Sequence, residues 1–158
     1  MTELDPKSPN RKIDKLRYTD RIYVPIGDFF VLHPRQFVLG ETLEWIHLSP
    51  TECAFVTSRS SWGRDGLVIA TAIGVHPTYT GILTLELTNV GEIPLKLYPG
   101  LAIAQLFIAE VTRTGPLVPS PSMFSVSTRP EIADPAQREL DMIDAFARYR
   151  GLEQTQDK

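Results

Sequence analysis

The sequence predicts an all-β domain, a sandwich or barrel of many short strands, and three observations support this. Thirteen prolines and ten glycines are scattered along the 158 residues, and short runs rich in Val, Ile, Leu, Thr, Phe and Tyr lie between them. Turn-forming pairs separate these runs. No segment before residue 130 repeats its apolar residues at the 3.6-residue period of a helix. We therefore expect strands near 22–26, 29–32, 36–39, 42–48, 53–58, 67–73, 82–88, 93–98 and 101–111.

Each of these strands ends at a recognisable breaker. Pro34-Arg35 and Ser49-Pro50 interrupt the first half of the chain, Asn89-Val90-Gly91 follows the run at 82–88, and Pro99-Gly100 precedes the last strand. The run at 82–88 alternates strictly, with leucines on one face and polar residues on the other. The last run is apolar on both faces, which is more apolar surface than one small β-sheet core can cover, so we expect a homotrimer.

The flanks differ from this β region, which we place at 22–112. Residues 1–21 carry six Lys or Arg and few apolar residues, so a flexible basic arm is a better interpretation than a dedicated anion site. Residues 113–130 hold four prolines among serines and indicate an extended linker. Residues 131–158 predict a C-terminal helix and tail, in which Asp134 caps the helix and Gly151 ends it.

Composition excludes several classes of protein. The net charge of −3 argues against a nucleic-acid binder that works through bulk positive potential. No apolar run approaches the roughly 20 residues of a membrane-spanning helix, and the first residues lack the apolar core of a secretory signal. Cys53 is the only cysteine and lies in an apolar stretch, so we expect a buried, inert thiol and no zinc site. These features predict a cytoplasmic protein without membrane or nucleic-acid partners.

A donor-rich segment, Ser58 to Gly66, follows the strand at 53–58. It holds two arginines, three serines and two glycines in nine residues. The planar guanidinium group suits phosphate oxygens, and small residues allow the backbone to approach a ligand closely. A phosphate-binding loop and a solvated polar turn are both open from this composition.

The alternating run at 82–88 places one carboxylate on its polar face. Leu83, Leu85 and Leu87 must enter the core, so Glu86 points out of the opposite face. If water covers that face, Glu86 is an ordinary surface carboxylate. If another strand or subunit covers it, Glu86 becomes a candidate for proton transfer. In the last strand Gln105 is the one polar residue of the run at 101–108, and a buried amide there would need backbone or ligand partners.

The order of these segments resembles the dCTP deaminase branch of the dUTPase-like superfamily. RSSWGRDGL is followed by AIGVHPTYTGILTLELTNVG and LYPGLAIAQLFI, and FFVLHPRQFVLGETLEWIHLSP precedes them. The resemblance covers about residues 29–110. It implies a distorted jelly roll or β-clip that forms homotrimers, with nucleotide sites between subunits. It also implies zinc-independent hydrolysis of the 4-amino group of dCTP, with Mg²⁺ bound through the triphosphate.

The resemblance assigns roles to individual residues. Its general acid/base falls on Glu86, its water-holding serine on Ser60, and its arginine that stabilises the glutamate on Arg64. Glu86 would take a proton from the water that attacks C4, pass it to the ring nitrogen and help ammonia to leave. The substrate-binding positions implied by the same resemblance are Arg59, Ser61, His76, Tyr79 and Gln105, with no metal bound directly by the chain.

Two other functions remain open at this stage. The first is a non-catalytic trimeric module that keeps the fold and a nucleotide pocket. The second, less favoured, is a dUTP pyrophosphatase or a bifunctional deaminase-pyrophosphatase. The relatives that cleave dUTP have an aspartate where this chain has His76 and an apolar residue where it has Glu86, so we expect dUTP rather than dUMP as the product.

Overall fold

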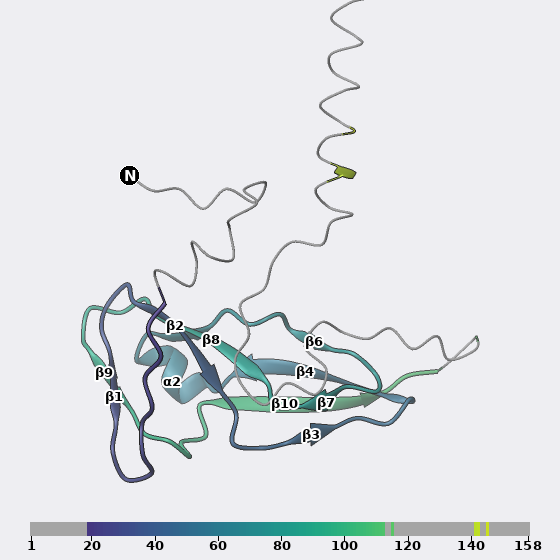
Figure 1. Ribbon diagram of the computed structural model, residues 1–158, viewed down its shortest axis with the longest axis horizontal. Coiled ribbons are helices and arrows are strands. Elements are labelled where there is room, and N and C mark those ends of the chain that lie inside the picture. The colour runs from purple at the N-terminus through teal and green to yellow at the C-terminus, as the bar shows by residue number, and fades with distance from the viewer. Residues whose placement is uncertain (1–18, 113–114, 116–140, 143–144, 146–158) are drawn as a thin grey trace, which may run out of the picture. The chain divides into compact units, whose positions relative to one another are not determined.

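The computed structural model describes residues 19–112, 115, 141, 142 and 145. The chain divides into two compact units, one of residues 23–131 and one of residues 1–22 with 132–158. The first unit contains all the described strands (Figure 1). These are β1 (Phe30–Leu32), β2 (Phe37–Glu41), β3 (Ile46–His47), β4 (Glu52–Ser58), β5 (Leu67–Ile69), β6 (Gly74–Val75), β7 (Thr80–Gly81), β8 (Thr84–Asn89), β9 (Leu95–Leu97) and β10 (Ala104–Glu110).

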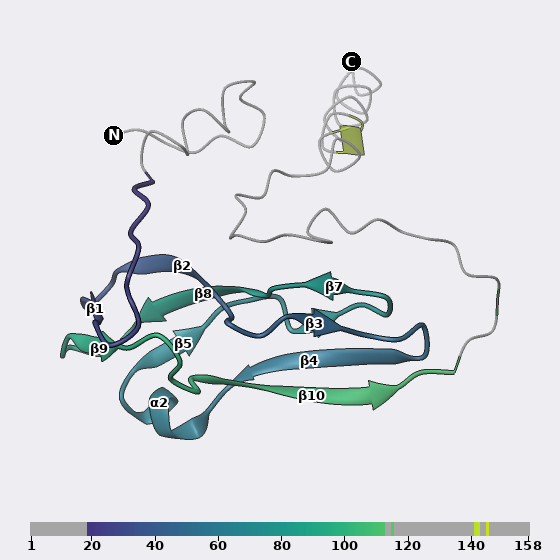
Figure 2. The ribbon, with the colours of Figure 1, turned by 60° about the horizontal axis from the view of Figure 1, so that its bottom comes forward.

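The strands form two three-stranded sheets and two short ribbons, and every pairing is antiparallel. One sheet has the order β2-β8-β5 and the other β10-β4-β6, while β1 pairs with β9 and β3 with β7. Figure 2 shows β2 and β8 in one layer above β4 and β10 in the other. The expected all-β fold is therefore confirmed.

The core lies between the two sheets. Leu85 and Leu87 of β8 are buried together with Ala54 and Val56 of β4, and Leu83 joins the same cluster. This is the burial that the alternation at 82–88 predicts, because side chains on one face of a strand share one environment. The polar positions between the leucines, Glu86 included, consequently lie on the face turned away from β4.

A five-residue helix, α2 (Ser60–Arg64), connects the two sheets where strand prediction gave only a polar loop. Arg59 is its N-cap residue, and Gly66 follows it with φ +93°. A helix this short presents no repeat of apolar residues, so periodicity does not reveal it. The two-residue strands β6 and β7 escape prediction for the same reason.

Two sequence expectations are wrong, the strand at 22–26 and the burial of Cys53. Residues 22–26 form no strand, since Pro25 lacks a backbone donor and its carbonyl accepts a turn hydrogen bond from the Asp28 N–H. The last run leaves part of its surface uncovered in the single chain, because Gln105 and Phe107 lie exposed on the outer face of β10. The amide of Gln105 is therefore not a buried group that needs partners. Cys53 is a free thiol as expected, but it is half-buried rather than buried.

The predicted flanks fall mostly outside the described residues. This holds for the basic arm up to residue 18, for the linker at 113–130 except Gly115, and for most of the C-terminal helix. Residues 141, 142 and 145 are helical. No helix in the described ranges is long and apolar enough to cross a membrane.

Candidate active site

Glu86 occupies the middle of the central strand of the β2-β8-β5 sheet. It pairs with Leu39 of β2, and on the other side its carbonyl accepts the Ala70 N–H at 2.8 Å. Its side chain is half-buried on the outer face of the sheet. Within the described part of the chain, no hydrogen bond or ion pair engages the carboxylate. This acid is thus held at a fixed place in a sheet while its oxygens remain available.

Apolar side chains lie next to Glu86 on a sheet face that also carries Glu41 and the threonines of β8. Side chains paired directly across an antiparallel sheet share a face, so Leu39 lies beside Glu86. The two residues that pair with Thr88, one on β2 and one on β5, lie next to them on the same face. These two residues are Phe37, which is 57% exposed, and Val68, which is 37% exposed. A carboxylate among exposed apolar side chains suits proton transfer once a ligand or a subunit covers it and excludes water.

The α2 segment presents donors rather than acceptors. Ser60, Ser61 and Arg64 are exposed, while Trp62 packs against the core and anchors the helix. Arg59 is tied to the start of the last strand: its N–H donates to the Ile103 carbonyl at 3.1 Å, and its Nη1 donates to the Ala102 carbonyl at 3.3 Å. The segment offers hydroxyl and guanidinium groups of the kind that bind phosphate oxygens.

Within one chain, the structure does not bring the hydroxyl and guanidinium groups of the α2 segment to Glu86. The α2 helix begins at the end of β4, whereas the Glu86 carboxylate lies on the sheet face turned away from β4. Among the residues placed by the structure, no hydrogen bond or ion pair links Ser60 or Arg64 with Glu86. Gln105 lies opposite Thr57 on the outer face of the other sheet. The single chain therefore does not bring Ser60, Arg64 and Gln105 together with Glu86.

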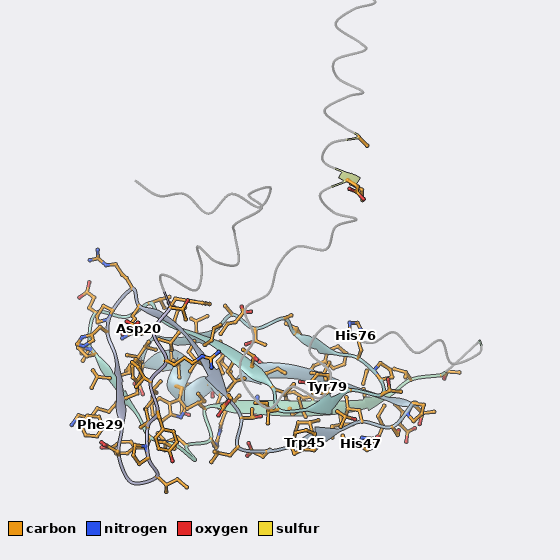
Figure 3. The ribbon with its side chains drawn as sticks, in the orientation of Figure 1. Asp20, Phe29, Trp45, His47, His76 and Tyr79 are labelled. Atoms are coloured by element: carbon orange, nitrogen blue, oxygen red, sulfur yellow. The ribbon has the colours of Figure 1, made fainter. Side chains whose placement is uncertain are left out.

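His76 and Tyr79 bound a tight turn. The Tyr79 N–H donates to the His76 carbonyl at 3.2 Å, and Thr78 between them has φ +68°. The Tyr79 hydroxyl donates to the Ile82 carbonyl, and burial raises the pKa of this phenol. His76 is exposed near the end of β6, as Figure 3 shows. Tyr79 thus secures its own loop with its hydroxyl, and a ligand would meet the ring or the turn backbone.

Comparisons with known proteins show the family of this chain. A family profile described as dCTP deaminase-like matches residues 1–111. The chain belongs to the dCTP deaminase-like family. A dCTP deaminase of Natronomonas pharaonis is 44% identical over 102 residues, covering 64% of this chain and 51% of the relative. A dUMP-forming dCTP deaminase of Corynebacterium jeikeium is 38% identical over 112 residues, covering 70% of this chain and 57% of the relative.

A solved structure supports the fold. The crystal structure of 2′-deoxycytidine 5′-triphosphate deaminase from Agrobacterium tumefaciens superposes with a TM-score of 0.51 and 18% identity, covering 63% of this chain and 32% of that one. The dUTPase-like architecture is therefore confirmed. The chain spans about half the length of the curated relatives it matches.

Asn89 has a structural role that the sequence does not reveal, because Asn89-Val90-Gly91 has the composition of an ordinary turn. Its side chain is fully buried, and its Nδ2 donates to the carbonyls of Leu32 at 3.0 Å and Ile93 at 2.8 Å. Its Oδ1 accepts the Gly91 N–H at 2.9 Å. Asn89 thereby fixes the end of β8, three residues from Glu86, against β1 and the loop before β9.

Among the described residues, no three His, Cys, Asp or Glu side chains gather in a group that could hold a metal ion. The groups near α2 are hydroxyls and guanidinium groups, which suit the phosphates of a nucleotide. Mg²⁺ in such sites is commonly held by substrate phosphates with one or two carboxylates.

Proposed function

We propose that this chain carries the deamination site of a dCTP deaminase, which converts dCTP and water to dUTP and ammonia. Family membership supports the reaction class, and the names of the relatives point to the substrate. The observation that carries the proposal is Glu86, a half-buried carboxylate without a protein partner in the described residues, held on the central strand of a sheet.

Glu86 is the general acid and base of the proposed reaction. Its carboxylate takes a proton from water as the oxygen attacks C4 of cytosine, and passes that proton to N3. The resulting tetrahedral carbon carries a hydroxyl and an amino group. Glu86 then moves the hydroxyl proton to the amino group, so the C4–N4 bond breaks, ammonia leaves and the C4 carbonyl of uracil forms. In the remaining assigned roles, Ser60 holds the attacking water and Arg64 stabilises the glutamate.

We propose further that the site forms between subunits of a homotrimer. The Glu86 carboxylate and the α2 segment of one chain are directed to different sides of the domain, so Ser60 and Arg64 would come from a neighbour. The domain also exposes apolar side chains that an assembly would cover, including Phe107, which is 57% exposed, and its cross-strand partner Phe55. In a closed ring of three identical subunits, one patch of each subunit is buried against a different patch of the next subunit.

The proposed substrate contacts follow from the donors on the surface. Arg59 and Ser61 would hold the phosphates, Gln105 would lie near the phosphate end, and the turn from His76 to Tyr79 would border the nucleotide. Mg²⁺ would enter with the triphosphate and neutralise its charge, and the family resemblance implies that hydrolysis proceeds without zinc. We expect the enzyme to act in the cytoplasm, where deoxynucleotides are available.

The proposed product is dUTP. Several relatives, including that of Corynebacterium jeikeium, are named dUMP-forming, so a second step that releases pyrophosphate is the competing possibility. In this chain His76 stands in an exposed turn where the dUTP-cleaving relatives have an aspartate. A neutral imidazole lacks the negative charge that would orient water beside the phosphates, and a protonated one cannot act as a base.

The test is to incubate the purified chain with dCTP and Mg²⁺ and to measure ammonia, dUTP, dUMP and pyrophosphate separately. We expect ammonia and dUTP in equal amounts, and at least a ~10²-fold lower turnover for Glu86→Gln with its fold intact. Glu92→Gln, an exposed loop substitution, is the matched control and should match the parent. Equal turnover in the parent and Glu86→Gln contradicts the assignment, and binding without turnover in the parent favours the non-catalytic module.

A further inference from the structure

The hydrogen-bond ladder between β5 and β8 changes partner at Glu86. Residues 67–69 pair regularly with residues 87–89, and the Ala70 N–H continues the pattern by donating to the Glu86 carbonyl. A regular pair would return the Glu86 N–H to the Ala70 carbonyl. Instead this N–H donates to the Thr71 Oγ1 at 2.7 Å. A side-chain hydroxyl thus replaces a backbone carbonyl at the proposed catalytic residue.

Thr71 lies where the chain leaves one sheet for the other. The backbone bends at this residue, and two residues later the Ile73 carbonyl accepts the Val56 N–H from β4 in the opposite sheet. Without a substitute partner, the crossing would leave the Glu86 N–H unpaired at a half-buried position. Unpaired backbone groups away from water are costly, so the hydroxyl stabilises the point where the ladder ends.

The Thr71 hydroxyl uses both of its hydrogen-bonding roles on β8. It accepts from the Glu86 N–H, and it donates to the Thr84 carbonyl at 3.3 Å. These two groups flank Leu85, whose side chain is buried in the core. The β-branched threonine side chain has few rotamers, so its hydroxyl is held in place. Thr71 thereby restrains β8 at Glu86 from the side opposite β2.

We propose that Thr71 is a positioning residue that fixes the Glu86 backbone, and so its carboxylate, for proton transfer. This inference rests on the proposed function, because it assigns Thr71 a role in the same reaction. The predicted effect is on the chemical step: a misplaced acid/base group lowers kcat, whereas nucleotide binding through the α2 donors does not depend on Thr71. Misplacement by about 1 Å is enough to cost up to ~10²-fold in rate.

The test compares Thr71→Val, which keeps the shape and removes the hydroxyl, with Thr71→Ser, which restores it. We expect kcat for dCTP to fall at least ~10-fold in Thr71→Val with KM within about twofold, and Thr71→Ser to recover most of the rate. Thr51→Val is the matched control, since it removes an exposed hydroxyl that bonds to Ser49 in the turn before β4 and should leave kcat within about twofold of the parent. Parent-like kcat in a folded Thr71→Val contradicts the proposal. If Thr71→Val does not fold, Thr71→Ala carries the same prediction.

Amide hydrogen exchange provides a readout that does not need activity. The Glu86 N–H should exchange at least ~10-fold faster in Thr71→Val than in the parent or in Thr71→Ser, while amides of β4 stay unchanged. An unchanged exchange rate at Glu86 overturns the proposal even if the parent does not deaminate dCTP. Faster exchange in a protein without deaminase activity would instead uphold the contact and reject the proposed function, so the two failures are distinguishable.

Discussion

Thr78 adopts a backbone conformation that a β-branched residue rarely tolerates, and replacing it should stabilise the protein. It follows Pro77 in the turn closed by the Tyr79 N–H and the His76 carbonyl, and its φ is +68°. Left-handed geometry costs an L-residue about 1–2 kcal/mol, and glycine avoids this cost. Glycine in turn loses more chain entropy on folding, which costs about 0.5–1 kcal/mol. The Thr78 side chain is exposed, so Thr78→Gly should raise the free energy of unfolding by about 0.5–1 kcal/mol.

Urea unfolding of the parent and Thr78→Gly at equal protein concentration measures this difference, since an oligomer's stability depends on concentration. Thr57→Gly is the matched control: Thr57 lies exposed in β4, where glycine should destabilise by about 1 kcal/mol. Arg35, with φ +64° after Pro34, is a second turn of the same kind, and Arg35→Gly should also stabilise. A lower midpoint for Thr78→Gly than for the parent would refute the assigned strain.

Three further substitutions test the framework. Asn89→Ala should lower the free energy of unfolding by about 3 kcal/mol in urea titrations, since the buried Leu32 carbonyl loses its donor; a loss below about 1 kcal/mol would contradict this. Gly66→Ala should lower the free energy of unfolding by at least ~2 kcal/mol, because the new Cβ would lie 2.7 Å from the Gly91 nitrogen and the residue has φ +93°. A melting curve like that of the parent would show that the two backbones do not approach so closely. The Ser49 backbone N–H donates a hydrogen bond to the Glu52 carboxylate and lowers the pKa of that carboxyl. The bond therefore stabilises the fold at neutral pH, and this stabilisation is lost as pH falls through the lowered pKa. Stability should therefore fall less between about pH 6 and pH 3 in Glu52→Gln than in the parent, and equal slopes would argue against this hydrogen bond.

The β8 strand shows what the sequence could predict. The alternation of Leu83, Leu85 and Leu87 determines which face is buried, and this alone places Glu86 on the opposite face. Such a local pattern needs no knowledge of the rest of the fold. The exposure of Gln105 could not be predicted, because an apolar sequence does not distinguish a buried strand face from one left open in a single chain.

Long-range contacts account for what the sequence could not predict. Asn89 bonds to a carbonyl 57 residues away, and Thr71 bonds to the N–H of a residue 15 positions later. Both residues look like ordinary turn or strand residues, because their roles arise only when the strands meet. The roles of Ser60 and Arg64 stay predictions, since one chain does not bring them to Glu86.

Mixed oligomers test most directly the central claim, a deaminase site that Glu86 of one subunit completes with Ser60 of a neighbour. Glu86→Gln and Ser60→Ala are each expected to be inactive on dCTP. When the two variants are co-expressed in equal amounts and purified together, about a quarter of the sites in randomly assembled oligomers hold both native residues. We predict ammonia release at about a quarter of the parent rate. Activity no higher than that of the separate variants would contradict the shared site.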